Sequence, residues 1–210
     1  MSASRRIIVG ITGASGVIYG IRLLEALRPT PLETHLIMSR AAVMTLAYET
    51  DLKLPDVRAL ADACHSVHDV AANPSSGSYR TAGMVIAPCS MRTLAEIATG
   101  VTSNLLSRSA DVILKERRRL VLLVRETPLH TVHLRNLLTA AELGAVIAPP
   151  VPAFYNRPQS VDDLVNHTVG RVLDLFDIDT GQVRRWGETP ALEEDQLDTS
   201  DPSRKSRINS

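Results

Sequence analysis

The sequence predicts an α/β domain with a doubly wound, mostly parallel sheet. Short apolar runs rich in β-branched residues alternate with segments of helical period, a pattern typical of parallel strands covered by helices on both faces. A glycine turn follows the first run. Residues with hydroxyl groups, charged residues or prolines follow nearly all of the remaining runs. The five runs are Ile7–Ile11, His35–Met38, Met84–Ala87, Leu120–Val124 and Ala145–Ala148.

The glycine turn is Thr12-Gly13-Ala14-Ser15-Gly16, and a helical segment follows it from Val17. Such a turn exposes backbone N–H groups at a helix N-terminus, where the partial positive charge of the helix favours an anion. Ser15 adds a hydroxyl donor. We therefore expect a phosphate-bearing ligand here, although the same turn also fits a strand–helix connection that binds nothing.

The residues after each run are candidate site residues, because doubly wound sheets bind ligands at the carboxyl ends of their strands. Ser39-Arg40 follows the second run, Pro88–Thr93 the third and Arg125–Pro128 the fourth. A charged pair such as Arg125-Glu126 directly after a buried strand is typical of an active site. Cys89 lies at the same edge, where a packing role fits it equally well.

Later helices begin at recognisable caps. Thr127 as N-cap with Pro128 at the first helical position predicts one helix, and Ser160 with Asp163 fits a capping box for another. The basic run Lys115–Arg119 is expected to end a helix, where cations complement the dipole. The position at a helix end accounts for the basic residues, so the run does not indicate a nucleic-acid-binding site.

Composition excludes several classes of protein. The chain has 210 residues, enough for one sizeable core, and its 23 Lys and Arg balance 23 Asp and Glu. Long-range attraction to nucleic acid or to an anionic membrane is therefore not expected. No apolar run approaches the roughly 20 residues that span a bilayer, and the start of the chain does not resemble a signal peptide. We expect a cytoplasmic protein.

The two cysteines, Cys64 and Cys89, are too few for a disulfide framework and are expected to be free thiols. From Gly187 onward the sequence turns polar and acidic. We therefore expect a single domain over residues 1–186 and a disordered tail over 187–210.

Two other kinds of site are disfavoured. The pairs His65 with His68 and His130 with His133 have the spacing of two ligands on one helix face, but neither has an evident third ligand, so we expect surface histidines on helices and no metal. A nicotinamide site is disfavoured because the second run ends in Ser39-Arg40 rather than in an acidic residue for a ribose.

Several motifs together resemble the flavin prenyltransferase family, a branch of the homo-oligomeric flavin-containing cysteine decarboxylase superfamily. The resemblance runs in order from about Arg5 to Trp186. Its motifs are Thr12–Gly16, Pro88-Cys89-Ser90 with Thr93, Ala110–Val112 with Lys115–Arg118, Arg125–Pro128, Phe154-Tyr155 and Pro158–Ser160.

The resemblance implies a flavodoxin-like or Rossmann-like three-layer sandwich and a metal-independent reaction. Such enzymes transfer a dimethylallyl group from dimethylallyl phosphate to N5 and C6 of reduced FMN. The product, prenylated FMN, serves a separate decarboxylase of unsaturated or aromatic acids, as in ubiquinone synthesis. The family commonly assembles as a dodecamer with sites between subunits.

The resemblance also implies roles for particular residues. The expected FMN-binding residues are Gly13, Ala14, Ser15, Ser39, Ser90, Met91, Arg92, Thr93 and Arg125. The expected contacts to dimethylallyl phosphate are Tyr155, Arg171, Arg108 and Lys115. The expected catalytic residues are Glu49, Glu126, Ser15 and Lys115, with the two carboxylates moving protons and the cations stabilising the departing phosphate.

Two alternatives remain at this point. An FMN-dependent cysteine decarboxylase of the same superfamily would need a Pro-x-Met-Asn segment, whereas this chain has Pro152–Pro158 with Phe154 and Tyr155. A non-catalytic flavin-binding regulatory subunit would not need the charged residues Glu49, Arg125 and Glu126.

Overall fold

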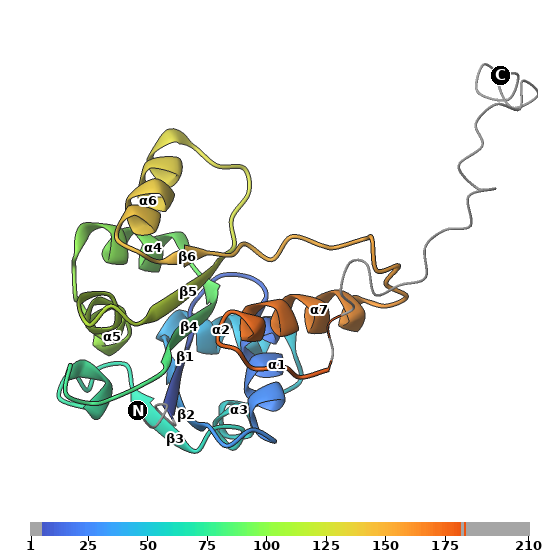
Figure 1. Cartoon of the computed structure of the whole chain (residues 1–210), viewed down its shortest axis with the longest axis horizontal. Coiled ribbons are helices and arrows are strands. Elements are labelled where there is room, and N and C mark those ends of the chain that lie inside the picture. The colour runs from blue at the N-terminus through green and yellow to red at the C-terminus, as the bar shows by residue number, and fades with distance from the viewer. Residues whose placement is uncertain (1–5, 182, 184–210) are drawn as a thin grey trace, which may run out of the picture.

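The sheet has six strands, and every neighbouring pair is parallel (Figure 1). The computed structural model describes residues 6–181 and 183. The strand order is β3-β2-β1-β4-β5-β6, so the chain winds outward from β1 in both directions and the doubly wound prediction is confirmed. The strands are β1 (Arg6–Ile11), β2 (Glu33–Met38), β3 (Ala63–Ser66), β4 (Gly83–Cys89), β5 (Arg119–Val124) and β6 (Val146–Ile147).

Helices cover both faces of the sheet and complete a three-layer sandwich (Figure 1). One face carries α1 (Val17–Leu27), α2 (Arg40–Glu49), α3 (Leu54–Arg58) and α7 (Val161–Asp174). The other carries α4 (Met91–Thr99), α5 (Leu105–Lys115) and α6 (Thr131–Glu142). A 3₁₀ turn, η1 (Asn73–Ser75), precedes β4.

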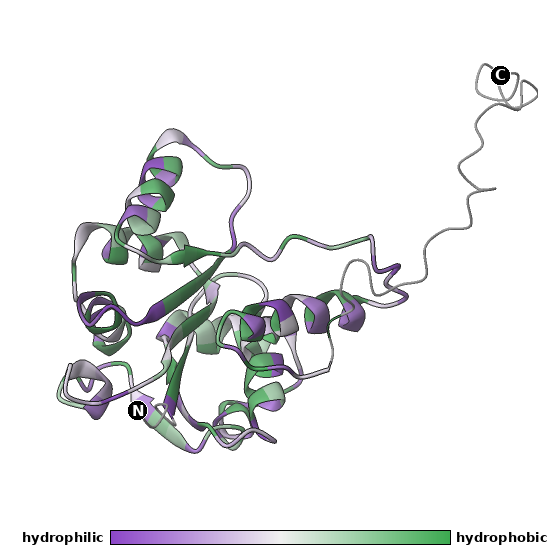
Figure 2. Ribbon diagram, viewed as in Figure 1, coloured by the Kyte–Doolittle hydropathy of each residue, from purple (hydrophilic) through white to green (hydrophobic). Residues whose placement is uncertain are grey.

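The central strands are hydrophobic along most of their length (Figure 2). Their apolar side chains are buried on both faces of the sheet, which explains the continuous apolar runs. Side chains alternate between faces along a strand, so Ile7 and Val9 pack with α1 and α7, whereas Ile8 packs with α4 and α5. Full burial of each such side chain contributes about 1.5–3 kcal/mol. This double core holds the carboxyl ends of β1 and β4 in fixed positions.

Two strand predictions need correction at the sheet edges. The strand β3 has no counterpart among the predicted runs, because its sequence Ala-Cys-His-Ser is polar and its burial alternates as an edge strand's does. The run Ala145–Ala148 yields only the two residues of β6.

The helix predicted at Thr127 and Pro128 begins later. The bond between these residues is a cis peptide, and α6 starts at Thr131 with His130 as its N-cap. The capping box of Ser160 and Asp163 at α7 is confirmed. The basic run ends α5 at Lys115 as expected, although Arg119 already belongs to β5.

No helix within residues 6–181 is long and apolar enough to cross a membrane. The domain end expected at residue 186 and the tail expected over 187–210 lie outside the described residues.

Candidate flavin site at the carboxyl edge of the sheet

A buried threonine joins the ends of the two central strands. The hydroxyl of Thr12 donates to the carbonyl oxygen of Pro88 at 2.7 Å and accepts from the backbone N–H of Ser90 at 2.7 Å. The backbone N–H of Thr12 donates to the same carbonyl at 3.2 Å. The glycine turn after β1 and the first residue after β4 are therefore held side by side.

The outer strands are tied to this centre by backbone hydrogen bonds. The N–H of Ser39, after β2, donates to the carbonyl of Ile11 at 3.0 Å. The N–H of Arg125, after β5, donates to the carbonyl of Cys89 at 3.1 Å. The structure thus brings the residues after four strands to one edge, where parallel sheets bind ligands.

Gly13 lets α2 approach this edge closely. A Cβ atom at Gly13 would overlap the Cβ of Ala41 in the first turn of α2. No other residue fits here without moving α2, so the glycine sets the position of α2 against the turn after β1.

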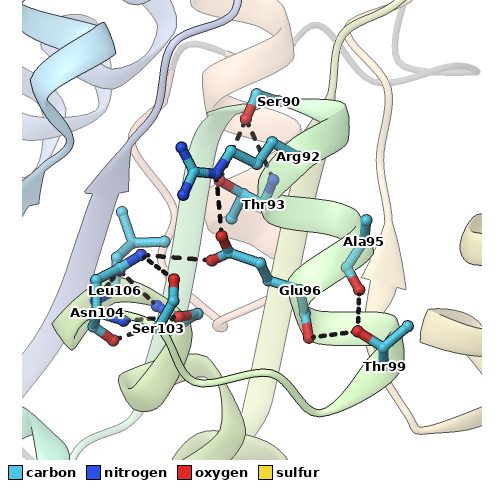
Figure 3. Close-up of polar contacts among 10 residues, drawn as sticks. Ser90, Arg92, Thr93, Ala95, Glu96, Thr99, Ser103, Asn104 and Leu106 are labelled. Carbon is cyan, nitrogen blue, oxygen red and sulfur yellow. Dashed lines mark hydrogen bonds and ion pairs between the residues drawn. The ribbon is translucent and has the colours of Figure 1, made fainter.

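The N-terminus of α4 is open toward this edge. Ser90 caps the helix, with its side chain accepting from the N–H of Thr93 at 3.3 Å (Figure 3). Within the described residues, the N–H groups of Met91 and Arg92 have no acceptor. Two free donors and the positive end of the helix dipole therefore face outward, which suits a phosphate.

The side chain of Arg92 does not contribute to that opening. Its guanidinium lies along α4 and donates to Glu96 at 3.1 Å (Figure 3). Glu96 also accepts from Asn104, the N-cap of α5, at 3.4 Å. At the start of α4, Arg92 therefore presents its backbone N–H and not its side chain.

The N-terminus of α1, in contrast, is already filled. The carboxylate of Glu49 accepts from the N–H of Gly16 at 2.9 Å and from that of Val17 at 3.0 Å. The anion that this N-terminus receives is the chain's own side chain, so the N–H groups of Gly16 and Val17 are already occupied. Ser15 is exposed and does not cap the helix, whose N-cap is Gly16 in the left-handed region at φ 101°.

Arg125 and Glu126 lie exposed beyond the end of β5. Glu126 accepts from the N–H of Thr127 at 2.9 Å, which orients its carboxylate. Among the cations expected to bind phosphates, Arg125 alone has no ion-pair partner within residues 6–181. Its charge is therefore available to a ligand.

The other expected cations are paired with neighbouring carboxylates. Arg108 pairs with Asp111 at 2.7 Å, and Arg171 with Asp174 at 2.6 Å. Lys115 pairs with Glu116 at 2.6 Å, and this hydrogen bond lowers the pKa of the Glu116 carboxyl.

Lys115 is not brought to the site within one chain. It ends α5 four residues before β5 begins, and its Nζ packs against Gly77 in the segment before β4. Both neighbours lie at the amino edge of the sheet, opposite the edge that carries Ser90 and Arg125. A single chain therefore separates Lys115 from the other expected site residues.

Tyr155 lies in the segment between β6 and α7, and its hydroxyl contacts a buried histidine of α7. The distance from Tyr155 Oη to His167 Nε2 is 3.1 Å. His167 was not singled out from the sequence. The available signal was its place four residues before Arg171, one helical turn away on the same face.

The remaining histidines and Cys89 do not form a reactive centre. His65 lies on β3 and His68 in the turn after it, so their expected placement on a helix is wrong. His130 caps α6 and stacks on His133 within it. Residues 6–181 contain no group of three or more His, Cys, Asp or Glu side chains arranged to hold a metal ion. Burial raises the pKa of the Cys89 thiol, which favours a packing role.

The residues at this edge fit FMN. The open start of α4 suits the terminal phosphate, since its two free N–H groups lie beside the Ser90 hydroxyl. Arg125, which has no ion-pair partner within the described part of the chain, follows β5 at the same edge, and its backbone N–H donates to the carbonyl of Cys89. The carboxylates of Glu49 and Glu126 supply proton acceptors at the same edge of the sheet.

Comparisons with known proteins identify the family of the chain. Residues 1–173 match the family model described as Flavoprotein. The chain is 63% identical over 175 residues to the flavin prenyltransferase UbiX of Escherichia coli K12, covering 83% of this chain and 93% of that protein.

Two solved structures share the fold over nearly their whole length. The crystal structure of AnUbiX (PadA1) in complex with FMN and dimethylallyl pyrophosphate is 56% identical, with a TM-score of 0.86, covering 88% of this chain and 98% of that one. A dodecameric FMN-dependent UbiX-like decarboxylase from Escherichia coli O157:H7 is 52% identical, with a TM-score of 0.85, covering 86% and 98%. The chain therefore belongs to the Flavoprotein family and, within it, to the flavin prenyltransferases of the UbiX type.

Proposed function

We propose that this protein is a flavin prenyltransferase that transfers a dimethylallyl group from dimethylallyl phosphate to reduced FMN. The observation that carries this proposal is the open N-terminus of α4 at the same edge as the carboxylate of Glu126 and as Arg125, which has no ion-pair partner among the described residues. A binding module would need the helix N-terminus but not the charged pair. The names of the relatives support the same reaction.

In this proposal the phosphate of FMN lies at the start of α4. The N–H groups of Met91 and Arg92 and the hydroxyls of Ser90 and Thr93 donate to it. Further contacts come from the turn after β1 and from the start of α2, namely Gly13, Ala14, Ser15 and Ser39. Bound in its reduced form, FMN supplies the nucleophilic N5 and C6 atoms.

Arg125 stabilises the charge that the leaving phosphate develops. The C–O bond of dimethylallyl phosphate breaks with both electrons going to the phosphate, so a fixed guanidinium lowers the barrier more than it stabilises the substrate. Removal of one such donor typically costs about 2.7–4 kcal/mol of transition-state stabilisation. Tyr155 and Arg171 bind the same phosphate.

Glu126 and Glu49 handle the protons. A bond from N5 to the dimethylallyl carbon that leaves the phosphate would release one proton from N5. The bond from C6 would require the double bond of the transferred group to take up one proton and C6 to lose one, so that the flavin gains C5H8 overall. A positioned carboxyl group can accept and return these protons. Glu126 is oriented by the N–H of Thr127, and Glu49 is oriented by the N-terminus of α1, with Ser15 beside it. Each carboxylate is thus held by backbone donors rather than by a neighbouring cation.

The site is completed by a second copy of the chain. Lys115 and Arg108 lie on α5, and Lys115 is at the opposite edge of the sheet from Arg125, so we assign both to the site of a neighbouring subunit in a dodecamer. We place the reaction in the cytoplasm. The product would serve a separate decarboxylase that uses prenylated FMN.

The test is to incubate the purified protein with FMN and dimethylallyl phosphate under reducing, oxygen-free conditions and to measure the mass of the bound flavin by mass spectrometry. A flavin heavier by one C5H8 unit is expected. Unchanged FMN on a folded, flavin-loaded protein would contradict the proposal and would favour the cysteine decarboxylase or the regulatory subunit.

A substitution separates catalysis from binding. Glu126→Gln keeps the shape of the side chain but removes the proton acceptor, so we expect turnover to be lost while FMN stays bound. Glu142→Gln, on the exposed end of α6, is the matched control and should keep full activity. Undiminished turnover in Glu126→Gln would remove this residue from the proposed mechanism.

A further inference from the structure

A surface cavity of about 200 Å³ lies where β2 and the edge strand β3 meet α2 and α3. The ends of β4 and β5, which carry Ser90 and Arg125, lie on the other side of β1 in the sheet. Of the described residues that line the cavity, none is among those expected to bind FMN. The cavity therefore has no part in the reaction proposed above.

Part of the lining is apolar. Leu36 of β2 is buried, and Met38, Val43 and Leu54 are half-buried. An apolar cavity of about 150 Å³ is large enough to bind benzene, whereas drug-sized ligands occupy roughly 300–1,000 Å³. The volume of this cavity therefore fits a molecule with a single ring.

Two arginines supply positive charge to the same cavity. Arg40 is the first residue of α2 and Arg58 is the last residue of α3, and both are exposed. No carboxylate within the described residues forms an ion pair with either guanidinium. Among the described residues of the lining, none is acidic. A guanidinium binds a carboxylate through two parallel hydrogen bonds, so the charge of the cavity favours a carboxylic acid.

We propose that this cavity is a binding site for a small carboxylic acid with one apolar ring. The guanidinium groups of Arg40 and Arg58 bind the carboxylate, and the ring lies against Leu36, Val43 and Leu54. The proposal does not depend on the prenyl transfer, because it involves neither FMN nor the prenyl donor.

Cys64 provides a reporter of occupancy. Its thiol lines the cavity and donates to the carbonyl oxygen of Arg58 at 3.4 Å. The other cysteine of the chain, Cys89, is fully buried. An alkylating reagent should therefore modify Cys64 and spare Cys89, and a ligand in the cavity should slow the modification of Cys64.

The test measures the rate at which iodoacetamide alkylates Cys64 in the full-length protein, with and without benzoate at constant ionic strength. We expect a dissociation constant of about 1 mM, so benzoate at about 10 mM should slow the alkylation about tenfold. Benzamide has the ring without the charge, inorganic phosphate has the charge without the ring, and both should protect Cys64 less than benzoate does. No protection by benzoate, or equal protection by either comparison compound, would overturn the proposal.

Substitution of the arginines locates the bound carboxylate. Arg58→Gln and Arg40→Gln should each weaken the binding of benzoate at least roughly tenfold. Burial raises the pKa of the Cys64 thiol and the Arg58 charge opposes that rise, so the rates with and without benzoate are compared within each variant. Arg135→Gln, on an exposed position of α6, is the matched control and should bind benzoate as the wild type does. Undiminished protection in both cavity variants would overturn the proposal.

Saturation with FMN separates this cavity from the flavin site. The two sites come close along the chain, since Ser39 lies between the lining residues Met38 and Arg40. Benzoate should protect Cys64 equally well in the protein loaded with FMN. Competition between FMN and benzoate would place the acid in the flavin site and overturn the proposal.

Discussion

The N-termini of α1 and α4 lie at the same edge of the sheet and are joined through Thr12, yet within the described residues only that of α1 holds an anion. The N-terminus of α1 holds the carboxylate of Glu49, a residue of the same chain, whereas the N-terminus of α4 leaves two N–H groups without an acceptor in the described residues. Helix N-termini attract anions in general, so the motif alone does not say which one binds. The difference is that a carboxylate of the same chain accepts from the N–H groups at the start of α1, whereas no described residue accepts from those of Met91 and Arg92 at the start of α4.

This contrast has a sequence origin. Gly13, before α1, allows α2 to pack closely, because a side chain there would overlap Ala41, and α2 ends at Glu49. The start of α4 has Ser90, whose short side chain caps the helix by accepting from the N–H of Thr93. Gly13 in the turn therefore serves the packing of α2.

The largest effect should come from making α4 resemble α1. Ser90→Asp keeps a good N-cap but places a carboxylate at the open donors. Two like charges about 5 Å apart near a protein surface repel by about 3 kcal/mol, so we expect FMN to bind at least roughly 100-fold more weakly. Titration of flavin fluorescence measures the affinity.

The control is Ser160→Asp, which makes the same change at the cap of α7. It should leave the affinity for FMN unchanged. An unaltered affinity in Ser90→Asp would mean that the flavin phosphate does not lie at α4.

The second prediction disturbs the packing that fills α1. Gly13→Ala forces α2 away from the turn, and overpacking of this kind costs about 1–3 kcal/mol. Because α2 also carries Glu49, the hydrogen bonds to α1 should weaken at the same time. The melting temperature should fall by several degrees. Gly144→Ala is the comparison, because Gly144 has open space around it and its substitution costs only the strain of an alanine at positive φ, without overpacking. Equal stability of Gly13→Ala and wild type would contradict the close approach.

The third prediction empties the N-terminus of α1. Glu49→Ala removes the acceptor of Gly16 and Val17, and we expect a loss of about 1 kcal/mol and a fall of about 2–4 °C in the melting temperature. Added phosphate should restore more stability to this variant than to the wild type, since the vacated donors can then bind it. If phosphate stabilises both proteins equally, the two N-termini do not differ as described.

The smallest effect concerns pH and lies away from both N-termini. His35 is buried on β2, its Nδ1 is 2.9 Å from Nε2 of His65 on β3, and burial lowers the pKa of both rings. The folded chain then binds fewer protons than the unfolded chain just below pH 6.5, so stability is complete above that value and falls as the pH is lowered. We expect a lower melting temperature at pH 5.5 than at pH 7.5.

His65→Asn should reduce this pH dependence, and His68→Asn, in the exposed turn, should not. A pH dependence of undiminished size in His65→Asn would contradict a contribution from His65.

Much of the fold follows from the sequence because its signals are local. Fully buried strands such as β1 and β4 read as continuous apolar runs, and the caps Ser90 and Ser160 mark helix starts. The edge strand β3 is held by backbone pairing to β2 and carries no apolar run, so no local signal reveals it. Thr127 does not cap a helix, because α6 begins at Thr131 with His130 as its N-cap, four residues beyond the position that the capping signal indicates.

The site is less predictable because its key contacts join distant residues. The placement of Ser39, Ser90 and Arg125 at one edge of the sheet can be predicted, because each residue directly follows a parallel strand. The capture of the α1 N-terminus by Glu49 depends on how α2 packs, 33 residues further along the chain. The buried contact of His167 with Tyr155 likewise needs the path of the loop after β6.

The position of Lys115 at the opposite edge of the sheet from Arg125 has a genetic consequence. On the proposed assembly, each reaction centre combines Lys115 of one subunit with Glu126 of another. Two inactive alleles, one lacking Lys115 and one lacking Glu126, would therefore complement each other in a cell that expresses both. Mixed oligomers would contain some centres in which both halves are intact, so the alleles would behave as if they lay in different genes.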